Sequence, residues 1–204
     1  MLSRMRPDDY THEELRDMGV ASVGTHVRIH RSVQLFNCSH IHFGDNTRVD
    51  CFSVISAGEA GVHIGNCVHL AAGVYLFGSG GGITLEDFVG LSSRVSVYTA
   101  SDDYVDGFMT NPTIPDEFRR VTRGDVLLKK HVIVGAGSVI LPDVQLGVGA
   151  AIGALTCIRQ NIADFEIWVG GGMAAKWAGV RDRSLLEREP ACRHQLRRAG
   201  RLSV

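Results

Sequence analysis

Three side chains of this sequence are suited to activating or holding a nucleophile near neutral pH. His69 carries an imidazole, the usual general base there because its ordinary pKa lies close to 7. Asp102 and Asp103 are adjacent, and a carboxyl with an ordinary pKa of about 3.9 is a weak base for a hydroxyl group. Either carboxylate is better suited to orienting a histidine or to holding an ammonium group. The alternative is that both aspartates only tie a turn.

A repeat of six residues determines how these side chains are positioned. An amphipathic helix would repeat at three and four residues, and a half-buried strand would alternate at two. A period of six predicts a short strand and then a turn, with the opening residue pointing to the axis. Three such strands make a triangular coil, and stacked coils bury a continuous core. The opening residues are Val23, Ile29, Leu35, Phe43, Val49, Ile55, Ile64, Leu70, Leu76, Leu85, Leu91, Val97, Leu128, Val134, Ile140, Leu146, Ile152 and Ile158.

The repeat predicts an all-β fold, a parallel β-helix over residues 23–170. An ordinary antiparallel β-protein would not keep a fixed register over the six consecutive units that begin at Leu128. His69 closes its unit just before the inward Leu70, so its side chain should point outward. We expect the glycines after the opening residue to tolerate an unusual backbone at each corner. These glycines are Gly24, Gly44, Gly65, Gly135, Gly147 and Gly153.

Three segments lie outside the repeat. In residues 1–22, Thr11 and Glu14 fit a capping box, which predicts a short helix stopped by Gly19. Residues 100–126 form an insert with two X-Pro steps, which we expect to project and cover a neighbouring subunit. Residues 171–204 form a basic tail, predicted to be helical after Asp182 and broken at Pro190.

Composition excludes several classes of function. In 204 residues, 21 Lys and Arg nearly balance 22 Asp and Glu, which argues against a general nucleic-acid binder. No apolar run approaches the roughly 18 residues of a membrane span, and the first residues contain no signal region. Five cysteines without a CxxC pair indicate buried free thiols rather than a metal site. We therefore expect a cytoplasmic protein.

Four segments resemble one family. They are Ile64–Ala72 (IGNCVHLAA), Ser101–Tyr104 (SDDY), Met109–Pro115 (MTNPTIP) and Val134–Val139 (VGAGSV). Together with the repeat, they resemble the hexapeptide-repeat acyltransferases over nearly the whole chain, in the branch of maltose, galactoside and O-antigen sugar acetyltransferases. This resemblance implies a left-handed β-helix and a homotrimer with active sites between subunits. It also implies acetyl transfer from acetyl-CoA to the hydroxyl or amine of a sugar or nucleotide-linked amino sugar, in lipopolysaccharide synthesis.

The chain departs from the family at the catalytic segment. The galactoside and maltose enzymes carry their histidine in a Tyr-Thr-Ala-x-His-Pro-like run, and in the matching run, Tyr98–Asp103, Asp102 takes that place. His69 is then the candidate base and Asp102 its orienting partner. The two lie on different faces of one subunit, so they would meet only across a trimer groove.

The resemblance also implies the cofactor contacts. The backbone of the repeat would bind the pantetheine arm, and two basic residues would meet the phosphates. The family's Gly-Asn-Pro-Ala-Lys ending is Gly170–Lys176 in this chain, which keeps the lysine and loses the proline. Trp177 is placed either to stack on adenine or to fill a core or an interface. The predicted cofactor residues are Ala136, Gly137, Ser138, Gly153, Ala154, Lys176 and Arg181.

Two other functions are compatible with a β-helix. A γ-type carbonic anhydrase binds zinc through three histidines, with a pair five residues apart. The nearest pairs in this chain are His26/His30 and His63/His69, spaced four and six apart. A non-catalytic scaffold would need neither the insert nor the cofactor-like ending.

Overall fold

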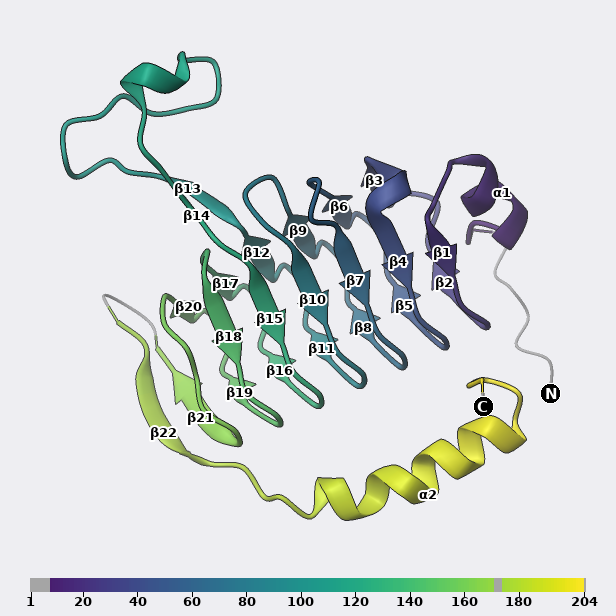
Figure 1. Ribbon diagram of the computed structural model, residues 1–204. Coiled ribbons are helices and arrows are strands. Elements are labelled where there is room, and N and C mark those ends of the chain that lie inside the picture. Colours follow the sequence, from purple (N-terminus) through teal and green to yellow (C-terminus); the bar gives the residue numbers. More distant parts are fainter. Residues whose placement is uncertain (1–7, 171–173, 204) are drawn as a thin grey trace.

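The strands wind into three parallel sheets, one along each side of a triangular coil (Figure 1). The computed structural model describes residues 8–170 and 174–203. Sheet 1 contains β1 (Ser22–Val23), β4 (Ile41–Phe43), β7 (Val62–Ile64), β10 (Ile83–Leu85), β15 (Val126–Leu128) and β18 (Val144–Leu146). Sheet 2 contains β2 (Arg28–Ile29), β5 (Arg48–Val49), β8 (His69–Leu70), β11 (Gly90–Leu91), β16 (Ile133–Val134), β19 (Ala151–Ile152), β21 (Glu166–Val169) and β22 (Lys176–Val180). Sheet 3 contains β3 (Gln34–Phe36), β6 (Val54–Ser56), β9 (Tyr75–Phe77), β12 (Ser96–Tyr98), β17 (Val139–Ile140) and β20 (Cys157–Ile158).

The register confirms the six-residue repeat. On sheet 1, Leu85 pairs with Ile64 of the preceding coil and with Leu128 of the following one, and the other two sheets stack their opening residues in the same way. All the opening residues are buried except Val23 and Leu35 of the first coil, which are half-buried. Corner 1 here denotes the turns from sheet 1 to sheet 2, corner 2 those from sheet 2 to sheet 3, and corner 3 those from sheet 3 to sheet 1.

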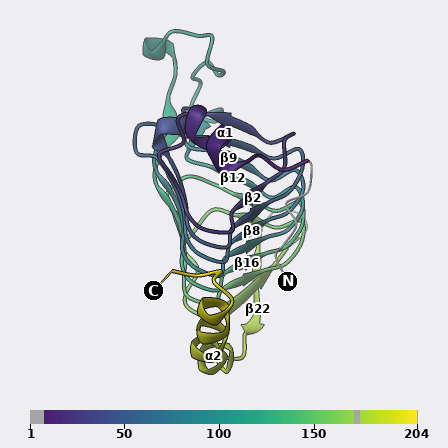
Figure 2. The ribbon, with the colours of Figure 1, turned by 90° about the vertical axis from the view of Figure 1, so that its right-hand side faces the viewer.

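A short helix, α1 (His12–Asp17), covers the first coil (Figure 2). The predicted capping box is present: the Glu14 amide donates to the Thr11 hydroxyl, and the Thr11 amide donates to the Glu14 carboxylate. Leu15 is buried in the core, and the helix stops before Gly19, as predicted, with Gly19 in the left-handed conformation.

The expected reason for the glycines after the opening residues is wrong. None of those six glycines has a positive φ. They are required because the next coil passes too close for a side chain: a Cβ on Gly135 would lie 2.4 Å from the Ala154 nitrogen. The left-handed backbone falls two residues later, at the fourth position of the unit, and most residues there are not glycine, such as Phe88 and His131.

The insert projects from corner 3, as predicted (Figure 1). Its base is an antiparallel pair formed by β13 (Ala100–Asp102) and β14 (Val121–Arg123). Two short 3₁₀ turns, η1 (Cys38–His40) in the first corner 3 and η2 (Asp116–Phe118) in the insert, complete this part of the chain. Coverage of a neighbouring subunit stays a prediction.

The C-terminal tail differs from the prediction in two ways. The strand β22, which pairs antiparallel with β21 at the end of sheet 2, was not predicted. The helix α2 (Leu185–Arg198) continues through Pro190 instead of breaking there. Tertiary contacts on both sides of the proline hold it: Glu189 bonds to His131, and Arg193 bonds to Asp87. The helix therefore runs back along corner 1 (Figure 2).

The cysteines are free, but the expectation that they are buried is wrong. Four are half-buried, because they lie in corners or on outward faces, and Cys192 is exposed on α2. No helix in residues 8–170 and 174–203 is both long and apolar enough to cross a membrane.

Candidate functional site

Asp102 lies at the base of the insert and is held by two donors. Arg119 Nη2 donates to Oδ1 at 2.9 Å, and the Asn111 amide donates to Oδ2 at 3.0 Å. The hydrogen bond from Arg119, followed by the one from Asn111, lowers the pKa of the Asp102 carboxyl. Asp102 therefore remains ionised at neutral pH. It is suited to holding a cation and poorly suited to removing a proton.

Asp103 is held in the same way on the other side of the strand. Its Oδ1 accepts from the Val105 amide at 2.8 Å and from the Asp106 amide at 3.3 Å, and Arg120 pairs with Oδ2. The hydrogen bond from the Val105 amide is the main cause of its lowered pKa. These contacts order the start of the insert and keep a second negative charge beside Asp102.

His69 points outward from β8, as predicted, and contacts a different carboxylate, that of Asp50. Its Nε2 lies 2.8 Å from Asp50 Oδ2, and Arg48 Nε donates to Asp50 Oδ1 at 2.6 Å. Burial alone would raise the pKa of Asp50, but the hydrogen bonds from Arg48 and His69 lower it overall. An ionised Asp50 thus fixes the ring of a half-exposed histidine.

Within one chain, the structure does not bring His69 and Asp102 together. His69 belongs to sheet 2, whereas Asp102 belongs to the insert that follows sheet 3. Sequence reasoning missed Asp50. The repeat contained the signal. Val49 pairs with Leu70, so Asp50, which follows Val49, lies diagonally beside His69, which precedes Leu70.

Corner 2 differs from corner 1 in its hydrogen bonding. At corner 1, the backbone amide of the third residue donates to a side chain of a neighbouring coil in five repeat units. The acceptor is a carboxylate or a side-chain amide, as when the Asn66 amide donates to Asp87. At corner 2, no acceptor within the described part of the chain receives the equivalent amides, which are those of Cys51, Ala72, Ser93, Ala136 and Ala154. Small residues in the neighbouring column, including Ala71, Gly135 and Gly153, leave room beside these amides.

The predicted cofactor residues divide between the two corners. Ala136, Gly137, Gly153 and Ala154 lie along corner 2, and Lys176 follows at the end of sheet 2, where it pairs with Val169. These five residues thus lie along one side of the coil. Trp177 is 57 % exposed, so it is not a core residue.

Ser138 and Arg181 are placed differently. Ser138 is fully buried, and its hydroxyl donates to the Gly153 carbonyl at 2.9 Å, so its side chain belongs to the interior of the coil. Arg181 lies at corner 1, where Nη1 donates to the carbonyls of His131 and Gly149. In the same chain, therefore, neither side chain lines the corner 2 column.

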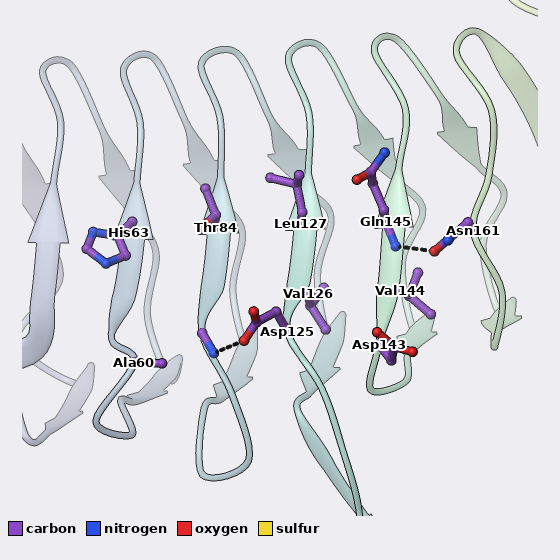
Figure 3. Close-up of a pocket in the computed structure, with 11 residues that line it drawn as sticks. Ala60, His63, Thr84, Asp125, Val126, Leu127, Asp143, Val144, Gln145 and Asn161 are labelled. Atoms are coloured by element: carbon purple, nitrogen blue, oxygen red, sulfur yellow. Dashed lines mark hydrogen bonds between the residues drawn. The ribbon is translucent and has the colours of Figure 1, made fainter.

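A large cavity lies on another face of the coil. It has a volume of about 560 Å³ and runs along β7, β10, β15 and β18 of sheet 1 (Figure 3). His63, Thr84, Leu127 and Gln145 line it from the four strands in turn, and Asp125 and Asp143 lie at its corner 3 edge. None of the residues predicted to be catalytic or cofactor-binding lines it.

Comparison with known proteins then identifies the family. An Escherichia coli dTDP-4-amino-4,6-dideoxy-D-glucose acyltransferase is 40% identical over 176 residues, which are 86% of this chain and 90% of that protein. The N-acyltransferase AntD of Bacillus cereus, solved with dTDP and 3-hydroxybutyryl-CoA, is 35% identical with a TM-score of 0.86, over 94% of this chain and 100% of that one. A serine-to-alanine variant of AntD, solved with dTDP-4-amino-4,6-dideoxyglucose and coenzyme A, is 36% identical with a TM-score of 0.87, over 93% and 100%. No family model matches the chain.

The chain belongs to the hexapeptide-repeat acyltransferases. Its fold is the parallel β-helix that the repeat predicted, with the left-handed sense that the resemblance implied, and the activity is acyl transfer. The comparisons give no support to a zinc carbonic anhydrase or to a non-catalytic scaffold. In the described part of the acyltransferase, no group of three or more His, Cys, Asp or Glu residues is arranged to hold a metal ion.

Proposed function

We propose that this acyltransferase moves an acyl group from acyl-CoA to the 4-amino group of a dTDP-linked 4-amino-4,6-dideoxy sugar. The observation that carries the proposal is 40% identity over 90% of an enzyme named for that acceptor. The structural likeness to AntD, solved with the same nucleotide sugar and coenzyme A, also supports it. Acetyl is the acyl group that the sequence predicts.

The charges at the insert favour an amine over a hydroxyl acceptor. Asp102 and Asp103 are carboxylates with lowered pKa values, each paired with one arginine, Arg119 or Arg120, and their oxygens can accept further hydrogen bonds from an ammonium group. A protonated amino sugar is attracted to such a site, whereas a hydroxyl gains much less from it. AntD variants were solved with either a serine or an aspartate substituted, ten positions apart. Ser92 and Asp102 have this spacing in our chain, as do Ser93 and Asp103.

Starting from a bound ammonium group, two protons leave the nitrogen: the first goes to water and frees the lone pair, and the second leaves as the C–N bond forms and ends on the sulfur. The amine attacks the thioester carbonyl, a C–N bond forms, and the C–S bond breaks as coenzyme A departs as a thiolate. We assign His69, fixed by Asp50, to receive the second proton from the nitrogen and pass it to the sulfur. Asp102 would hold the ammonium group in place beforehand. The alternative role of Asp102, orienting His69, is less well supported because Asp50 already contacts the imidazole ring.

The free amides of corner 2 suit the pantetheine arm. Pantetheine carries two amide groups, which need partners along an extended path. The column from Ala72 to Ala154 offers N–H donors on successive coils, spaced by about 4.8 Å. Lys176 at the end of this column supports binding of the cofactor phosphates.

We also propose that the enzyme works as a homotrimer. His69 and Asp102 lie on different sides of one chain, so a site that uses both needs a second subunit. The projecting insert supplies the means, because it extends beyond its own coil (Figure 1). Light scattering that gives a monomer of 22.1 kDa would contradict this proposal. Five free thiols support a reducing compartment such as the cytoplasm, whereas a role in lipopolysaccharide synthesis rests on the family resemblance alone.

A transfer assay tests the acceptor. Coenzyme A release is measured with acetyl-CoA and dTDP-4-amino-4,6-dideoxyglucose, and mass spectrometry of the product identifies an amide. The matched control is the nucleotide sugar with a hydroxyl at C4. We expect transfer to the amine and little to the hydroxyl. Equal turnover of both sugars would contradict an acceptor chosen for its amine, and no turnover of either would refute the proposed function.

A further inference from the structure

We propose that Arg28 and Arg48 bind the diphosphate of the nucleotide-linked acceptor. The inference rests on the proposed function and adds to it a subsite on the N-terminal half of sheet 2. The acceptor then has a direction along the coil, with its sugar near His69 and its diphosphate at Arg48 and Arg28.

The two arginines stand in one column with His69. The register pairs Arg28 with Arg48, Arg48 with His69, and His69 with Gly90. The outward side chains of this column are therefore two arginines and a histidine on the first three coils, and the fourth coil has a glycine. Beyond Gly90 the column continues with neutral residues, so positive charge is confined to the N-terminal end.

Both guanidinium groups retain donors for a ligand. Arg48 uses Nε for Asp50, which leaves Nη1 and Nη2, and its side chain is 42 % exposed. Arg28 is half-buried and forms no ion pair within the described residues. A guanidinium is well suited to phosphate oxygens, because its planar fork donates two parallel hydrogen bonds. Asp50 contributes by fixing the arginine at the same time as the histidine.

The spacing fits a nucleotide sugar. Successive coils are separated by about 4.8 Å, so Arg48 lies one step and Arg28 two steps from His69. In a 4-amino sugar the anomeric carbon, which bears the diphosphate, is across the ring from C4. When the C4 nitrogen is beside His69, the diphosphate falls within about two coils of it, at the level of the arginines.

The other candidate places carry the wrong charge. The cavity on sheet 1 is lined by Asp125 and Asp143 and by no lysine or arginine. The arginines of the insert already pair with carboxylates. Near Arg28 and Arg48 the acids are Asp50, described above, and Asp9, which is buried and forms no ion pair with either arginine.

Titration calorimetry on the full chain tests the subsite. The ligand is thymidine diphosphate, with inorganic pyrophosphate as a competitor. Arg28→Ala and Arg48→Ala should each weaken binding about tenfold or more, as expected for a lost charge-assisted contact, and the double variant should lose more. Arg188→Ala on the exposed face of α2 is the charge-matched control and should bind as wild type. Acetyl-CoA affinity should be unchanged in all variants, which also shows that they are folded.

The outcomes separate the subsite from the function. If the wild type binds thymidine diphosphate and transfers the acyl group, but the double variant binds it within about twofold of wild type, the subsite is wrong and the function stands. Loss of binding in Gln145→Ala alone would move the diphosphate to the sheet 1 cavity and overturn the proposal. If the wild type neither binds thymidine diphosphate nor acylates the dTDP amino sugar, both proposals fail.

Discussion

The docking of α2 against corner 1 depends on Arg193. Its Nη2 donates to Asp87 at 2.7 Å and its Nε donates to Glu189 at 2.6 Å. The guanidinium also lies 4.7 Å from the centre of the Phe88 ring. Glu189 is bonded in turn to His131 at 2.7 Å. Each of the four polar side chains in this cluster is less than one fifth exposed.

Arg193→Met keeps most of the stem of the side chain and removes its charge. Asp87 loses its ion-pair partner, and Glu189 keeps only the bond to His131. One charge-assisted hydrogen bond contributes roughly 1.5–3 kcal/mol, and two are lost. The measurable loss is smaller than their sum, because α2 can undock and return both carboxylates to water. We expect the docking of α2 to weaken by about 2 kcal/mol, which corresponds to an equilibrium constant for opening that is about 30-fold larger.

Hydrogen exchange of the amides in residues 185–198 measures this directly. Exchange in α2 should accelerate in Arg193→Met, whereas amides of the coil core, such as that of Leu91, should keep their protection. Arg188→Met is the matched control on the same helix and should change nothing. Unaltered exchange in α2 would refute the idea that this ion-pair cluster docks the helix.

The same cluster gives α2 a predictable response to acid. Burial would raise the pKa of Glu189, but the hydrogen bonds from His131 and Arg193 lower it overall. A carboxyl with a depressed pKa contributes stability that is complete above its unfolded pKa and is lost as the pH falls through the folded pKa. The protection factors of the α2 amides, which correct for the intrinsic dependence of exchange on pH, should therefore fall as the pH drops below the usual pKa of glutamate, about 4.3.

Three further outcomes are expected. His69→Ala should lower kcat about 10²- to 10⁴-fold, and Asp50→Asn should lower it less, with the double variant no worse than His69→Ala because the two act as a unit; additive losses in kinetic assays would contradict that coupling. Gly135→Ala should cost about 1–3 kcal/mol in thermal unfolding, since its Cβ would meet the next coil, whereas Gly90→Ala, with nothing within 4 Å, should be neutral. Lys176→Ala should weaken acetyl-CoA binding about tenfold and flatten its salt dependence, and an unchanged calorimetric Kd would remove Lys176 from the cofactor site.

The core could be predicted from the sequence because each coil applies the same constraint. An opening residue such as Leu91 must be apolar, since it contacts its equivalents above and below, and this requirement repeats every six residues. The capping box of Thr11 and Glu14 was predictable for a similar reason, because it lies within four residues. Both signals are local and periodic.

The remaining features depend on contacts between distant parts of the chain. Glu189 and His131 are 58 residues apart, so the sequence showed only a proline that should break α2. Asp102 is bonded to Arg119 across an insert that has no repeat. The role of the glycines was misassigned because a close approach between coils and a left-handed turn favour the same residue type.

The two corners show how a repeat built for stability leaves room for a site. At corner 1, Asp, Asn and Glu side chains bond to the amides of neighbouring coils, and α2 covers the turns. At corner 2 the same positions of the repeat hold Ala72, Ser93 and Ala136, and in the described part of the chain none of these side chains accepts a hydrogen bond from an amide of a neighbouring coil, so the donors stay available. An unpaired amide at the surface costs little while water can reach it, and a ligand that replaces the water gains the bond. Under the proposed function, the cofactor would therefore bind where corner 2 lacks such side chains, and the acceptor would be selected by charged residues, namely Asp102 and, by our inference, Arg28 and Arg48.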